Sequence, residues 1–152
     1  MDISFWATLW GFILGTTLGS FVLVLSHRSL NKKSFLGRSY CPHCKHTLSP
    51  YDLFPLISYF VLRGKCRYCH KKIGLEYLLV ELTIGILIAF LFWQSFKFFP
   101  GILDLFKLAI FTFDLIFKTF FISILGVVFI TDLKKMFIPD RVFLSSIVIA
   151  FI

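Results

Sequence analysis

Charged residues are scarce in this sequence. Asp, Glu, Lys and Arg make up only 16% of the 152 residues, whereas soluble domains carry about 25%. Hydrophobic residues reach 58% and include 21 phenylalanines, against about 45–50% apolar residues in a typical soluble domain. The shortage of charge excludes an ordinary water-soluble core of this size and indicates helices embedded in a lipid bilayer.

Acidic residues are the scarcer of the two charged classes, eight against sixteen basic ones. Ten of the sixteen Lys and Arg lie between Arg28 and Lys72, where Asp52 is the only acid. Such a basic segment can indicate nucleic-acid binding, but basic residues also accumulate in the cytoplasmic loops of membrane proteins. We favour the topological explanation and expect no nucleic-acid partner.

The sequence has no basic region before its first apolar run, and this run, from about Ile3 to Ser26, is too long for a cleavable signal peptide. Its N-terminal flank holds only Asp2, while its C-terminal flank begins with His27 and Arg28. The positive-inside rule therefore predicts an N-terminus outside the membrane and a cytoplasmic loop after this span.

Further apolar segments follow the loop. A membrane-spanning helix needs about 20 mostly apolar residues, and we expect such spans at about 75–96 and 115–133. From Val142 onward only about 11 mostly apolar residues remain, so we expect an incomplete fourth span and a sequence that ends inside it. The predicted fold class is an all-α polytopic membrane protein with a small cytoplasmic insert. Its predicted parts are a first membrane helix at 1–26, a module at 27–74 and membrane helices at 75–152.

Several residues in or beside the predicted spans indicate contacts with other side chains or helices. Glycine recurs every fourth residue at Gly11, Gly15 and Gly19, a pattern that lets another helix approach closely. Glu81 lies early in the second span, where a buried acid is costly and suggests a polar partner, structural or functional. A surface pair with i, i+4 spacing is predicted between Asp114 and Lys118.

All four cysteines lie in the predicted cytoplasmic loop, where a reducing environment disfavours disulfides. The pairs Cys41-Pro-His-Cys44 and Cys66-Arg-Tyr-Cys69 have nearly the spacing of a structural zinc ribbon. Two such turns together can provide tetrahedral sulfur ligation, which leaves no open position for catalysis. We therefore expect one structural Zn²⁺. The alternatives are four unrelated thiols, or replacement of one cysteine by His43, His46 or His70.

Asp132 lies at the predicted cytoplasmic end of the third span. A carboxylate at the edge of the hydrocarbon is a candidate for proton exchange in catalysis, but a boundary Asp is also a common surface residue. Asp140 follows Pro139 and is expected to cap the next helix, where negative charge is favourable. The residues alone leave both interpretations of Asp132 open.

Taken together, these motifs resemble the bacterial type IV prepilin leader peptidases, membrane aspartic proteases that also N-methylate the mature pilin N-terminus. The resemblance covers nearly the whole chain. It rests on an ordered series of segments: Gly19-Ser20-Phe21 with His27-Arg28, the two cysteine pairs, Asp52 to Tyr59, Ile73 to Glu81, and Ile130-Thr-Asp132 with Ile138-Pro-Asp140.

The resemblance implies a multi-pass protein of the bacterial plasma (inner) membrane. It implies cleavage of prepilin or pseudopilin substrates at the cytoplasmic face, with Asp132 as the first catalytic aspartate. It also implies S-adenosylmethionine as methyl donor, although no residue marks a binding site for it.

The chain departs from the family at two places. Leu23 stands where the family usually has Asn, and the Gly-x-Gly-Asp motif with the second catalytic aspartate is missing. Because aspartic proteolysis needs two carboxylates, we expect the N-terminal portion of such an enzyme, inactive without a missing C-terminal half. The alternative is a non-catalytic, membrane-anchored zinc module or fragment that acts in pilus or secretion assembly.

Overall fold

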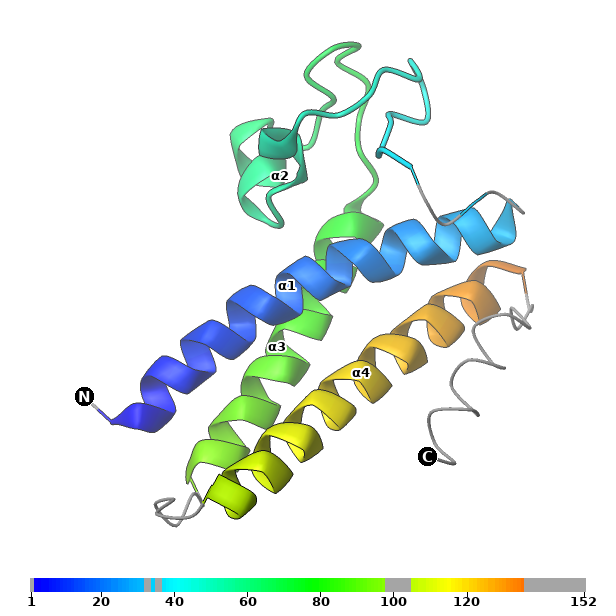
Figure 1. Cartoon of the computed structure of the whole chain (residues 1–152). Helices are drawn as coiled ribbons and strands as arrows, with labels where there is room; N and C mark the ends of the chain where they lie inside the picture. Colours follow the sequence, from blue (N-terminus) through cyan, green and yellow to red (C-terminus); the bar gives the residue numbers. More distant parts are fainter. Residues whose placement is uncertain (1, 32–33, 35–36, 98–104, 136–152) are drawn as a thin grey trace.

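The structure is a computed structural model that describes residues 2–31, 34, 37–97 and 105–135 (Figure 1). Its elements are, in order, α1 (Ile3–Leu30), the 3-10 helix η1 (Pro50–Leu53), α2 (Ile57–Val61), α3 (Leu75–Lys97) and α4 (Leu105–Lys135). The described part of the chain contains no β-strand beyond two isolated bridges. The all-α fold class predicted from the sequence is thus confirmed.

Three of these helices, α1, α3 and α4, are long and apolar enough to cross a membrane. Their outward faces expose large apolar side chains, such as Trp10 on α1 and Phe113 on α4, as expected for surfaces that face lipid. The second predicted span agrees closely with α3. The predicted fourth span, which follows Val142, lies outside the described residues.

The other two spans are longer than predicted. α1 continues past Ser26 to Leu30, and α4 begins at Leu105 rather than near residue 115. The early start of α4 carries the helix through Lys107 and Asp114, which we expected to lie before the span. Asp114 is accommodated on the helix surface, where the Lys118 ammonium lies 2.6 Å from its carboxylate and both side chains are about half exposed. The predicted i, i+4 pair is therefore confirmed.

The crossing of α1 over α3 depends on glycine (Figure 1). A Cβ atom on Gly15 would lie 2.8 Å from Cα of Gly85, and a Cβ atom on Gly19 would lie 2.9 Å from Cα of Glu81. Gly11 faces the ring of Phe92 in the same way. The glycine face predicted on the first span is thus the surface that packs against α3, with the two backbones in direct contact.

The apolar core gathers side chains from all three long helices. Its buried members are Val22, Leu23, Ile84, Ile88, Val127 and Ile130. Leu23, the position of one family departure, is fully buried in this cluster. It therefore contributes packing where an Asn would need a hydrogen-bonding partner. This core holds the last turns of α4 beside the C-terminal half of α1 and the N-terminal half of α3.

Candidate functional site

The first Cys-x-x-Cys pair lies on a tight turn closed by backbone hydrogen bonds. The N–H of Cys41 donates to the carbonyl of His46, and the N–H of Lys45 donates to the carbonyl of Cys41, both at 2.9 Å. Tyr40 and Thr47 form an antiparallel bridge around the turn. The turn holds the two cysteines on one side of a short, closed loop.

The second pair repeats this geometry at corresponding residues. Its bonds join Cys66 N–H to Lys71 at 2.9 Å and His70 N–H to Cys66 at 3.0 Å, inside a bridge between Lys65 and Lys72. In each turn, the residue after the second cysteine has a left-handed backbone. The sequence signal for this repeat, which we missed, is a Cys-x-x-Cys followed by two basic residues in both pairs.

The structure brings the two turns together. The ligand atoms of Cys41, Cys44, Cys66 and Cys69 all lie within 4.8 Å of one another, and the sulfurs of Cys41 and Cys69 are 3.9 Å apart. Tetrahedral zinc with bonds of about 2.3 Å would separate its sulfur ligands by about 3.8 Å. The four sulfurs therefore fit one metal ion. Among the described residues, the metal-binding group includes none of the loop histidines.

The thiols of this cluster differ in acidity. Burial raises the pKa of Cys41, but the N–H groups of Cys44 and His43 outweigh burial and lower that pKa to about 7. The N–H of Lys71 lowers the pKa of Cys69, but burial and the other three cysteines together raise it to about 11. Negative charge is thus more stable on Cys41 than on Cys69, and a bound metal ion would displace the proton of Cys69.

Asp52 connects the linker between the pairs to the second turn. Its Oδ2 accepts hydrogen bonds from the N–H and the hydroxyl of Ser49, at 3.2 and 2.9 Å, and its Oδ1 lies 2.8 Å from Nε of Arg67. The carboxyl side chain is 2% exposed. Burial raises the pKa of Asp52, but the bonds from Ser49 and the charge of Arg67 bring it below its usual value.

Glu81 connects the same linker to the membrane helices. Its Oε2 accepts a hydrogen bond of 2.9 Å from the N–H of Leu56, directly before α2, and the hydroxyl of Ser20 on α1 also bonds to this carboxyl group. Glu81 is 7% exposed. The polar partner predicted for this acid is confirmed, and it comes from both the cysteine module and α1.

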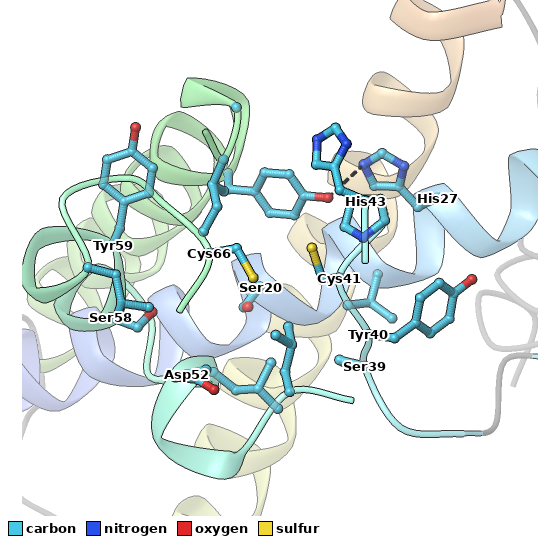
Figure 2. A pocket seen from close by; sticks show the side chains of 18 of the residues that line it. Ser20, His27, Ser39, Tyr40, Cys41, His43, Asp52, Ser58, Tyr59 and Cys66 are labelled. Atoms are coloured by element: carbon cyan, nitrogen blue, oxygen red, sulfur yellow. Dashed lines mark hydrogen bonds between the residues drawn. The ribbon is translucent and has the colours of Figure 1, made fainter. Parts of the chain in front are cut away.

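A cavity of about 410 Å³ lies between the module and the membrane helices. α1, the module and α3 all contribute to its wall, and Figure 2 shows how several of these side chains surround it. The lining includes Ser20 and His27 from α1, Asp52, Ser58 and Tyr59 from the linker, and Glu81 from α3. Cys41 and Cys66 also line it, so the cavity adjoins the candidate metal centre.

A polar cluster joins the three long helices near this cavity. The Lys134 ammonium on α4 lies 2.9 Å from the Glu76 carboxylate on α3 and 3.2 Å from Nε2 of His27 on α1. The ring of His27 stacks on Tyr77, with centroids 5.8 Å apart. The sequence did not predict this cluster, because His27, Glu76 and Lys134 lie far apart in the chain.

Asp132 lies in the last turns of α4, two residues before Lys134, and its side chain is exposed. It therefore stands at the end of α4 that contacts the polar cluster. Within the described part of the chain, Asp132 is neither among the grouped metal ligands nor in the wall of the cavity. Asp140, the second acid considered in the sequence, lies outside the described residues.

Comparison with known proteins gives a family match. The model of the Bacterial Peptidase A24 N-terminal domain matches residues 13–95, which include the cysteine module and most of α1 and α3. The match ends before α4, so it does not cover Asp132. No solved structure matches the chain at a significant level.

Several curated relatives are similar to the chain. The prepilin leader peptidase/N-methyltransferase of Vibrio cholerae is 35% identical over 149 residues, covering 92% of this chain and 53% of the relative. The Bacillus subtilis protein of the same name is 33% identical, covering 86% of this chain and 48% of the relative. The chain thus spans about half the length of these relatives.

Proposed function

Since the chain belongs to the bacterial A24 peptidases, the type IV prepilin leader peptidases, through their N-terminal domain, we propose that it supplies this portion of a membrane aspartic leader peptidase. Its proposed substrates are prepilin-like proteins or pseudopilins, cleaved at the cytoplasmic face of the membrane. The proposed second activity is N-methylation of the new N-terminus. The observation that carries the proposal is the family match across the whole cysteine module.

Asp132 is the proposed first catalytic aspartate. In aspartic proteolysis, one ionised carboxylate takes a proton from the attacking water, and a second, protonated one polarises the scissile carbonyl. An exposed carboxylate at the end of α4 could supply one of these two groups. We propose that the other comes from outside these 152 residues, because the sequence has no Gly-x-Gly-Asp segment.

Zn²⁺ is the proposed metal, held by Cys41, Cys44, Cys66 and Cys69. Four thiolates around zinc leave no open coordination position, so the ion would stabilise the module rather than take part in hydrolysis. The module has little apolar core of its own, since its described residues include only three buried ones, Cys41, Gly64 and Cys66, and its described large side chains are half-buried or exposed. Metal ligation would therefore provide much of its folding energy.

The proposed topology has the N-terminus outside and the cysteine module in the cytoplasm, in the bacterial inner membrane. It is supported by the basic residues of the module and by the position of Lys134, which pairs with Glu76 at the start of α3. With this orientation, Asp132 and the module lie on the same side of the bilayer. The division at 1–26, 27–74 and 75–152 remains our proposed domain organisation.

Reconstitution tests the proposed function. The chain would be expressed in bacterial membranes alone and together with the C-terminal half of the Vibrio cholerae relative, with a prepilin as substrate. We expect a size shift of the prepilin only when both parts are present. Absence of cleavage and methylation with both parts present, while membrane insertion and zinc content are normal, would contradict the proposal.

A second candidate function is a membrane-anchored zinc module that acts in pilus or secretion assembly without catalysis. It is favoured by the lack of the second aspartate motif in this sequence. Complementation of a strain that lacks the chain separates the two functions. A non-catalytic module would restore pilus assembly in a strain that lacks the chain, and Asp132→Asn would restore it equally well.

A further inference from the structure

The cavity between the cysteine module and the membrane helices has no role in proteolysis as proposed above, since Asp132 is not part of its wall. Its volume of about 410 Å³ falls within the range of about 300–1,000 Å³ that is usual for small-molecule sites. The exposed surface of the wall is mainly apolar and aromatic, although many of the lining residues carry a polar or charged group. A mainly apolar surface with polar groups that fix the ligand is typical of such sites.

Glu81 is the most unusual group in this wall. It is 7% exposed, and its hydrogen bonds come from the neutral donors Leu56 N–H and Ser20. No Lys, Arg or His among the described residues forms an ion pair with it. A buried carboxylate without a neighbouring positive charge is costly. A cationic ligand in the cavity would supply the missing charge.

Other parts of the wall suit the rest of such a ligand. Tyr59 and Tyr77 contribute aromatic rings, which attract cations and stack on flat heterocycles. Lys71 and Lys72 line the cavity and are exposed to solvent, where they could neutralise a carboxylate. Asp52 also lines the cavity, but Arg67 neutralises its charge. The cavity thus offers one buried carboxylate without an ion pair, aromatic surface and a basic edge, an arrangement that suits a zwitterion carrying an aromatic base.

We propose that this cavity binds a sulfonium methyl donor, S-adenosylmethionine, with Glu81 facing its positively charged sulfur centre and Lys71 and Lys72 near its carboxylate. The inference rests on the proposed N-methylation and assigns that activity a binding site. The donor supplies an activated methyl group. The chain contributes the pocket, the charge of Glu81 and the exclusion of water by the module.

Direct binding tests the site without relying on activity. The purified chain in detergent would be titrated with S-adenosylmethionine and with S-adenosylhomocysteine, which lacks the sulfonium charge. Glu81→Gln keeps the shape and can still accept the bond from Leu56, but it removes the negative charge. Its matched control is Asp114→Asn, an acid-to-amide change in α4 whose carboxylate pairs with Lys118 instead.

A second variant tests the cavity by filling it. Ser58 of α2 lines the cavity, whereas Val61 of the same short helix is 70% exposed. Ser58→Leu would occupy space in the pocket, and Val61→Leu would add a similar side chain outside it. Zinc content and helical circular dichroism, measured on every variant, report whether the fold is retained.

We expect Glu81→Gln to weaken binding of S-adenosylmethionine about tenfold, the scale of one lost charge interaction, with a much smaller effect on S-adenosylhomocysteine. Ser58→Leu should weaken both ligands, and the two controls should weaken neither. Wild-type affinity in both folded cavity variants would overturn the site. An equal loss of both ligands in Glu81→Gln would overturn the assignment of Glu81 to the sulfonium, since it would show that the side chain only holds the linker.

The reconstituted enzyme separates this inference from the proposed function. Suppose that the reconstituted enzyme methylates prepilin, but the cavity variants bind S-adenosylmethionine normally or the wild-type chain binds neither ligand. The cavity assignment then fails, and the proposed function stands. If it neither cleaves nor methylates, the proposed function fails. The predicted pattern of ligand binding would then still identify the cavity as a site for sulfonium compounds.

Discussion

Lys134 in the last turn of α4 lies 2.9 Å from the carboxylate of Glu76 in the first turn of α3. Each charge lies at the helix end where it is favoured by the backbone dipole, an acid near an N-terminus and a base near a C-terminus. His27 of α1 lies 3.6 Å from the same carboxylate. Because Lys134 is two residues from Asp132, this contact fixes the position of the proposed catalytic end of α4.

A double-mutant cycle on this pair should reveal coupling. We expect Glu76→Gln and Lys134→Gln each to destabilise the protein, and the double variant to lose less than the sum. The side chains are 45% and 27% exposed, so a coupling free energy of about 0.2–1 kcal/mol is expected. Thermal unfolding in detergent measures it. Strictly additive effects would show that the pair contributes nothing to holding α4.

Substitution of cysteines should remove the metal. Purified protein should contain about one equivalent of zinc, as expected for a single four-ligand site, and Cys41→Ser combined with Cys69→Ser should lose it. His46→Ser is the control, since His46 lies in the first turn but is not among the grouped ligands. Metal analysis after dialysis measures the content. Full occupancy in the double variant would contradict the four-thiolate site.

Asp132→Asn should abolish prepilin cleavage in the reconstituted enzyme, because an amide can neither take nor give the proton in the transition state. Asp140→Asn should have a small effect, since a helix cap contributes only about 0.5–2 kcal/mol even when it is replaced by Ala. The assay is the size shift of a prepilin in membranes. Zinc content should be unchanged in both variants. Robust cleavage by Asp132→Asn would place the catalytic pair elsewhere.

Labelling of single cysteines should reveal the orientation of the chain. On a background without the native cysteines, an impermeant reagent applied to intact spheroplasts should label a cysteine near residue 100. It should fail to label a cysteine at position 45 or 134 until the membrane is opened, because the basic loop is expected inside. Labelling of position 45 from outside would reverse the proposed topology.

Asp52 should make stability depend on pH. Its pKa is lowered in the folded protein, so the ionised form stabilises the fold above the unfolded pKa of about 3.9, and this contribution is lost as pH falls through the lower folded pKa. We expect wild type to be more stable than Asp52→Asn at pH 7. The difference should shrink as pH falls below about 4. Both variants contain the same cysteines, so the difference between their unfolding temperatures cancels the effect of cysteine protonation. A difference that does not change with pH would contradict this role of Asp52.

The sequence predicted the features that depend on local patterns. The apolar run that begins at Leu75 predicted α3, and the spacing of Gly15 and Gly19 predicted the face that contacts it. The cysteine pairs predicted a cluster because each Cys-x-x-Cys forms its own turn. These signals lie within short stretches of chain, so they can be detected without knowledge of the fold.

The features that sequence reasoning missed depend on contacts between distant segments. The sequence predicted a polar partner for Glu81 but could not identify Leu56 and Ser20, which approach it only after the module folds back on the helices. Lys134 and His27 are separated by most of the chain, and nothing near either residue indicates the other. The N-terminal start of α4 was misplaced because Lys107 and Asp114 interrupt the apolar run. The pairing of Asp114 with Lys118 nevertheless leaves the helix intact.

The glycine-lined crossing has a consequence for biogenesis. Gly15 and Gly85 bring α1 and α3 together without help from α4, whose main contacts lie on the surface that this pair presents. As the ribosome releases the chain in order, the first two spans can dock as a hairpin while α4 is still being synthesised. The end that carries Asp132 would then be added to an already assembled platform, and a defect at the glycine crossing would appear first as failed membrane integration and proteolysis of the nascent hairpin.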